Sequence, residues 1–233
     1  MTKTAVLLVL SLSALLNTGT VTAADEGIRL LKPQYDFTRA TLRHGAELFA
    51  NHCLGCHNLQ YLRYIRVADD LGLTKDDVVR TLMTPSGAEF NKGMISNLNA
   101  EDATNWFGAA PPDLTLEARY RGTDWIYTYL KSFYRDPKLP LGWDNHLFPR
   151  VAMPNVLASL GGARNAEGDI LEKGTMTPQQ FDQAVADLTA WLQYASDPSM
   201  LQRKVLGPWV MAFLMIFSVL AYLLKRVYWR NIH

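Results

Sequence analysis

The chain has 233 residues, of which 48% are apolar and 19% are charged. Its 23 Lys and Arg nearly cancel its 22 Asp and Glu, so we expect no basic surface for nucleic acid. Two cysteines are too few for a disulfide-stapled secreted scaffold, which packs more bridges into a shorter chain. The length fits one domain, or at most two small ones.

The N-terminal segment has the features of a secretory signal peptide. Lys3 precedes an apolar run over residues 5–16, and small residues around Ala23 match the pattern of a signal-peptidase site. An apolar run of about a dozen residues is short for a membrane span. We therefore expect residues 1–23 to be a signal peptide, with an uncleaved N-terminal anchor as the alternative.

Residues 24–204 have an ordinary globular composition, and we expect them to form one exported, mainly α-helical domain. The spacing of apolar residues predicts a helix over residues 38–51. A second helix is predicted over residues 122–134, with Thr123 as its N-cap and Pro137 as a stop signal. The domain should therefore be built around amphipathic helices.

The clearest helix signal lies near the end of this domain. Thr177, Pro178 and Gln180 form a capping box with proline in the first turn. We expect this helix to run to about Tyr194. Its inward-facing side chains are predicted to be Phe181, Val185, Leu188, Trp191 and Leu192.

Two long segments rich in Pro, Gly and Asn interrupt the helices, at residues 85–112 and 136–162. Loops longer than about 12–15 residues without structure of their own are usually functional. We therefore expect a ligand, rather than side chains alone, to fill part of the core.

Residues 206–224 form an uncharged apolar stretch near the C-terminus. Its length is close to the roughly 20 residues that a transmembrane helix requires. Trp209 and Tyr222 lie near its two ends, where aromatic rings prefer the headgroup zone. A buried core helix is the alternative, but such a helix is rarely apolar on every side. We expect a transmembrane anchor over residues 205–224 and a cytoplasmic tail over 225–233.

Both cysteines belong to a Cys-x-x-Cys-His motif formed by Cys53, Cys56 and His57. This motif attaches a c-type haem through both thiols, and its histidine can ligate the iron. A redox Cys-x-x-Cys pair would need a thioredoxin-like βαβ context, and a structural zinc site would need further ligands. Export also favours haem, so we predict one covalent haem c.

Several side chains are candidates for the second axial ligand of the iron. Met153 is the strongest candidate, because Pro149 and Pro154 favour an extended loop that could cross the far face of the haem. His52 is expected to be a solvent-facing neighbour of the attachment motif. The other candidates outside the apolar C-terminal stretch are His44, His146, Met83, Met94 and Met176.

Beyond this motif, the chain resembles the cytochrome c1 family, the haem subunits of the cytochrome bc1 complex. The resemblance extends from about Leu31 to the C-terminus and includes the terminal apolar anchor. The other matching segments are residues 53–57, the Ala-Pro-Pro-Asp-Leu-Thr sequence at 110–115, Ala118 with Arg119, and Trp191 with Ala-Ser-Asp-Pro at 195–198.

The resemblance implies roles for seven residues of the haem site. Cys53 and Cys56 would hold the haem, and His57 and Met153 would be its axial ligands. Arg119 would meet a haem propionate, while Pro112 and Trp125 would lie beside the haem. The Ala-Met-Pro-Asn-Val sequence around Met153 departs from the Gly-Met-Ala-Pro-Pro order of many family members.

The resemblance also implies an electron-transfer function in a bacterial inner membrane, with the haem domain in the periplasm. The haem would receive electrons from a Rieske iron-sulfur protein and pass them to a c-type cytochrome. The anchor would contact lipid and cytochrome b within a dimeric complex. One alternative is a free-standing, membrane-tethered cytochrome c shuttle. Another is a haem enzyme such as a peroxidase, which would need an open iron site or a second haem.

Overall fold

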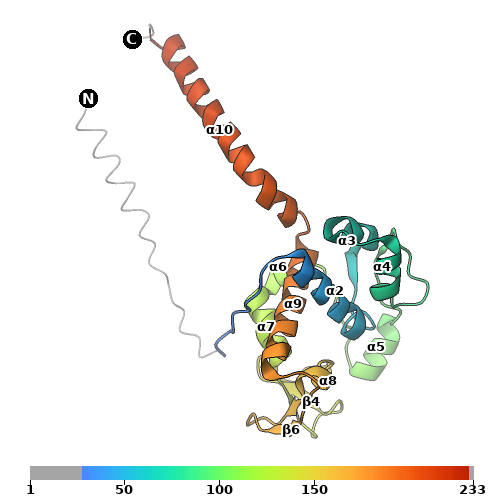
Figure 1. Ribbon diagram of the computed structural model, residues 1–233. Helices are drawn as coiled ribbons and strands as arrows, with labels where there is room; N and C mark the ends of the chain where they lie inside the picture. The colour runs from blue at the N-terminus through green and yellow to red at the C-terminus, as the bar shows by residue number, and fades with distance from the viewer. Residues whose placement is uncertain (1–27, 231–233) are drawn as a thin grey trace.

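The computed structural model describes residues 28–230. The expected signal peptide at residues 1–23 and the last three residues of the expected tail lie outside the described residues. Figure 1 shows a helical body, here called the head (residues 28–199), from which the long helix α10 (Met200–Tyr228) projects. Strands are few and short. The predicted fold class, mainly α with one C-terminal apolar helix able to span a membrane, is confirmed.

The centre of the head is a pair of packed helices, α2 (Arg39–His52) and α9 (Pro178–Ser196). They approach closely at Gly45, where an added Cβ would lie 2.2 Å from the carbonyl oxygen of Asp187. Phe49 and Trp191 are fully buried in this contact region of the core. Burial of such large side chains is the main favourable contribution to the stability of the head.

Local signals define α9 well. The Thr177 side chain accepts a hydrogen bond from the Gln180 backbone, and Gln180 Oε1 accepts one from the Thr177 N–H at 2.9 Å, so the predicted capping box is confirmed. The helix runs two residues past the predicted end, to Ser196. Of the predicted inward side chains, Phe181 is half-buried and the other four are buried.

One side of α2 carries α3 (Tyr64–Leu71), α4 (Lys75–Thr81) and α5 (Ala100–Phe107), as Figure 1 shows. A short antiparallel pair, β1 (Leu59–Arg63) with β2 (Gly93–Met94), lies among them. The segment expected as a loop over residues 85–112 therefore contains β2 and α5.

The other side of the core carries α6 (Glu117–Arg121) and α7 (Thr123–Lys131), which both pack against α9. The predicted helix over residues 122–134 was wrong at both ends. Its N-cap is Gly122, whose positive φ of 86° suits glycine, and Thr123 is already helical. The helix ends at Lys131.

The C-terminal end of α7 is set by strand pairing rather than by Pro137. Strand β3 (Phe133–Arg135) follows almost at once and pairs antiparallel with β4 (Trp143–Asn145). This end of the head also holds α8 (Ala158–Gly161) and the pair β5 (Ala163–Arg164) with β6 (Ile170–Glu172). The segment expected as a loop over residues 136–162 thus includes β4 and α8.

Helix α10 lies outside the core, and none of its residues is buried. Its most apolar window has a mean hydropathy of 2.0, so it is long and apolar enough to cross a membrane. It contains Pro208. At its start, the Arg203 guanidinium lies 2.5 Å from the Asp197 carboxylate, which ties α10 to the end of α9.

Candidate haem site

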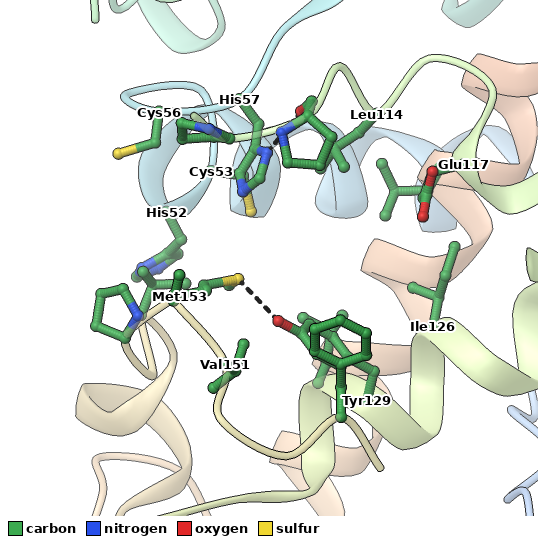
Figure 2. Close-up of a pocket in the computed structure, with 18 of the residues that line it drawn as sticks. His52, Cys53, Cys56, His57, Leu114, Glu117, Ile126, Tyr129, Val151 and Met153 are labelled. Atoms are coloured by element: carbon green, nitrogen blue, oxygen red, sulfur yellow. Dashed lines mark hydrogen bonds between the residues drawn. The ribbon is translucent and has the colours of Figure 1, made fainter. Parts of the chain in front are cut away.

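A cavity of about 320 Å³ opens between the attachment motif, helix α7 and the loop that carries Met153. Figure 2 shows His57 and Met153 on opposite sides of this space. Most of the lining is apolar, as expected for a site that receives a large apolar ligand. Its apolar side chains include Phe107, Leu114, Ile126, Leu130, Val151 and Leu188.

The attachment motif continues the last turn of α2. Cys53 is the C-cap of that helix, and its carbonyl accepts hydrogen bonds from the N–H groups of Cys56 at 3.0 Å and His57 at 2.8 Å. This tight turn brings all three side chains to one wall of the cavity. Both cysteines are free, and burial, together with the nearby Cys56 thiol, raises the pKa of Cys53 to about 12.

The ring of His57 is oriented by the Pro-Pro-Asp segment. Its Nδ1 atom donates a hydrogen bond to the Pro112 carbonyl oxygen at 2.8 Å. Burial lowers the pKa of His57, although the bond to Pro112 opposes this shift. The ring is therefore favoured in its neutral form, with the proton on Nδ1 and the Nε2 lone pair available to a metal.

The opposite wall carries the sulfur of Met153. The Tyr129 hydroxyl on α7 donates a hydrogen bond to this sulfur, with an O···S distance of 3.5 Å (Figure 2). Burial raises the pKa of Tyr129, so its hydroxyl stays protonated. The Tyr129 hydroxyl therefore orients the Met153 thioether.

Two charged side chains also line the cavity, Arg121 at the end of α6 and Glu117 in its first turn. They form an ion pair across one turn of the helix. The Arg121 guanidinium carbon lies 4.2 Å from the centre of the Trp125 ring. The mostly apolar lining therefore includes one ion pair, whose guanidinium also packs on an aromatic ring.

The sequence matches the model of the cytochrome C1 family over residues 30–232. The chain belongs to the cytochrome C1 family. It is 42% identical to cytochrome c1 of Allochromatium vinosum, over 84% of this chain and 86% of that protein. It is 40% identical to a Nitrosomonas europaea protein named ammonia monooxygenase gamma subunit, over 84% and 85% of the two chains. A third relative, the mitochondrial cytochrome b-c1 complex catalytic subunit of Candida albicans, is 28% identical over 91% and 81%.

Cytochrome c1 proteins are the haem subunits of the bc1 complex, so the expectation of a haem-binding electron-transfer subunit is confirmed. The cavity also fits a haem on its own geometry. It offers two thiols beside one wall, a neutral imidazole on that wall and a thioether opposite. Thiols, histidine and methionine are the groups that hold haem in c-type cytochromes.

Six of the seven residues expected at the cytochrome c1 site line this cavity: Cys53, Cys56, His57, Pro112, Trp125 and Met153. Arg119 does not. Its side chain is 70% exposed and lies 3.7 Å from the Asp197 carboxylate, near the start of α10. Residues two apart on a helix point about 200° apart, so Arg121 faces the cavity where Arg119 cannot.

The other ligand candidates lie elsewhere, with one exception. His52, expected to face solvent, is partly buried and lines the cavity. His44 lies 2.6 Å from Asp187, and His146 stacks on Tyr134. The candidate methionines contribute to the apolar core rather than to the cavity: Met94 is fully buried, and Met83 and Met176 pack against the core.

Besides apolar lining residues, three side chains with charged or hydrogen-bonding groups in the cavity were not predicted from the sequence: Glu117, Arg121 and Tyr129. The sequence does contain a pattern that could have indicated Arg121 and Tyr129. Together with the predicted residue Trp125 they are spaced four residues apart. Such spacing places side chains on one face of the chain where it is helical. The break at Gly122 between α6 and α7 obscures this pattern.

Proposed function

We propose that the protein is the cytochrome c1 subunit of a bacterial bc1 complex and holds one covalent haem c between His57 and Met153. One observation carries this proposal. The imidazole and the thioether lie on opposite walls of a single apolar cavity, and both thiols of the attachment motif border it. This is the arrangement of donors that a six-coordinate, tethered haem requires.

The chain's own residues would each have a distinct task. Cys53 and Cys56 would tether the haem, while His57 and Met153 would ligate its iron and so keep exogenous ligands away from it. The apolar walls exclude water and favour a high reduction potential. Arg121 provides a positive charge suited to a haem propionate. When bound, the haem supplies reversible one-electron chemistry at its iron.

The proposed electron path follows from this site and from membership of the family. The Rieske iron-sulfur protein donates an electron to the haem, and a c-type cytochrome accepts it. Helix α10 lies in the lipid beside cytochrome b, in a dimeric complex. The head is on the periplasmic side, which is consistent with the signal-peptide features of residues 1–23. An apolar helix without buried residues of its own supports the membrane location.

Purification from membranes in a mild detergent tests the proposed assembly. We expect the chain to copurify with cytochrome b and a Rieske protein and to be reduced by quinol in their presence. A second candidate function, as a subunit of a monooxygenase, rests on the relative named ammonia monooxygenase gamma subunit, and copurification with monooxygenase subunits would favour it. A haem protein that purifies alone would favour the free-standing shuttle.

Covalent attachment is tested on the denatured chain. Thioether bonds survive denaturation and acid-acetone extraction, so the polypeptide should retain one haem on a denaturing gel. The cytochrome b of the same preparation provides the control, because its haem is not covalently bound and should be released. Complete extraction of haem from this chain would contradict attachment through Cys53 and Cys56.

A further inference from the structure

Tyr129 is connected to the Met153 loop at two points. Its hydroxyl donates to the Met153 sulfur at 3.5 Å. Its backbone carbonyl accepts a hydrogen bond from the Asn145 side-chain amide at 2.8 Å. Asn145 is fully buried. Helix α7 is therefore held to this segment both at Met153 and at Asn145, eight residues before it.

Two side chains at the start of the loop fix its backbone. The Asp144 carboxylate accepts hydrogen bonds from the N–H groups of Arg150 at 2.6 Å and Val151 at 3.3 Å. The Asn145 side-chain oxygen accepts two more, from the N–H groups of Leu147 at 2.9 Å and Phe148 at 3.1 Å. The chain thus reaches Met153 in a defined conformation rather than as a free loop.

The Tyr129 ring is fixed as well. It stacks on Trp125, with ring centres 5.0 Å apart and an interplanar angle of 10°. Phe133 meets it edge-on, with ring centres 5.1 Å apart. These contacts restrict the ring from both sides, so the direction of the hydroxyl is set by packing before any ligand binds.

We propose that Tyr129 is a positioning residue that acts through the Met153 sulfur and raises the reduction potential of the haem. This inference rests on the proposed function, because it requires Met153 as an axial ligand. A thioether sulfur has two lone pairs, of which one can bind iron while the other accepts the Tyr129 hydrogen bond. That bond withdraws electron density from sulfur and weakens its donation to oxidised iron more than to reduced iron.

The test is Tyr129→Phe in the purified complex, since it removes the hydroxyl and keeps the ring. At a fixed solution potential, the ratio of reduced to oxidised haem should fall roughly two- to ten-fold, the equivalent of one hydrogen bond. Tyr127→Phe is the matched control. Tyr127 is also buried on α7, but its hydroxyl contacts the Lys131 ammonium at 3.3 Å and does not line the cavity. We expect no change in the ratio for this variant.

A double-mutant cycle separates an effect through sulfur from a general packing effect. In a Met153→His background the sulfur is absent, so the change caused by Tyr129→Phe should disappear. A change of equal size in both backgrounds, or none in the Met153 protein, would overturn the inference.

The weak sulfur-to-iron charge-transfer absorbance of the oxidised protein tests the ligand assignment separately. If the unmodified protein lacks this absorbance, or if Met153→Leu retains it, Met153 is not the ligand and the proposed haem site itself is wrong. If the absorbance is present and sensitive to Met153→Leu, an unchanged potential in Tyr129→Phe contradicts only the role of Tyr129.

Discussion

The imidazole of His57 is hydrogen-bonded to a carbonyl oxygen of a loop 55 positions further along the chain, that of Pro112. The next residue, Asp113, anchors this loop. Its carboxylate accepts hydrogen bonds from the N–H groups of Gln60 at 2.9 Å and Thr115 at 2.8 Å. Asp113 therefore acts on the histidine indirectly, by holding the carbonyl that orients the ring.

Replacing Asp113 by Ala should loosen this loop and the histidine that it orients. Two hydrogen bonds to a carboxylate are lost, each with a typical net contribution of about 1.5–3 kcal/mol. We expect a lower free energy of unfolding in urea and faster binding of cyanide to the oxidised haem. Glu89→Ala is the control, because Glu89 is exposed and makes no side-chain hydrogen bond or ion pair within the described residues. Equal stability of both variants would contradict the role of Asp113.

The contact between α2 and α9 predicts a severe effect of Gly45→Ala. The added methyl group would lie 2.2 Å from the Asp187 carbonyl oxygen and 2.8 Å from the Trp191 Cβ, so the two helices must separate. Overpacking of this kind typically costs about 1–3 kcal/mol. Urea unfolding measures the loss. Glu47→Ala, on an exposed position of the same helix, should leave the free energy of unfolding nearly unchanged.

The two arginines of α6 should behave differently. Arg121→Gln removes a positive charge from the cavity wall, which should destabilise the reduced haem relative to the oxidised haem and lower the potential. Arg119→Gln should leave the potential unchanged, because the Arg119 side chain lies 3.7 Å from Asp197 and does not line the cavity. Redox titration of both variants decides the matter. A shift for Arg119→Gln alone would restore the role implied by family resemblance.

Acid should weaken the junction between α9 and α10. Hydrogen bonds from Arg203 and Ser199 hold the pKa of Asp197 at about 2, below its usual 3.8. A depressed carboxylate pKa stabilises the folded state above about pH 4, and this contribution disappears as the pH falls through about 2. The stability difference between the unmodified protein and Asp197→Asn should therefore be constant near neutral pH and shrink below about pH 4. A difference independent of pH down to 2 would contradict the prediction.

Features of the fold that depend on nearby residues could be predicted from the sequence. The capping box of Thr177 and Gln180 is completed within one turn, and the haem attachment motif lies within five residues. The end of α7 could not be predicted in this way. It depends on pairing of Phe133 with Asn145, a contact between strands that no local preference specifies.

The candidate site shows the same limit. Met153 was identified from its flanking prolines, but its partner Tyr129 lies 24 positions earlier in the sequence. Which of two arginines faces the cavity depends on how the short helix α6 packs on α9. The rotation of α6 about its own axis is set by tertiary contacts such as the burial of Ala118. Resemblance to the family motif at residues 110–119 therefore did not show that Arg121, rather than Arg119, lines the cavity.

Helix α10 is longer than the hydrocarbon layer that it is suited to cross. Its 29 residues span about 43 Å at about 1.5 Å per residue, whereas the hydrocarbon layer is about 30 Å thick. The surplus fits the two headgroup layers, so the first turns of the helix would lie in the headgroup layer nearest the head. The ion pair of Asp197 with Arg203 ties these turns to the end of α9 in the head. In the proposed membrane location the cavity would be kept at a set height above the bilayer, and a redox partner would have to bring its own cofactor to that height.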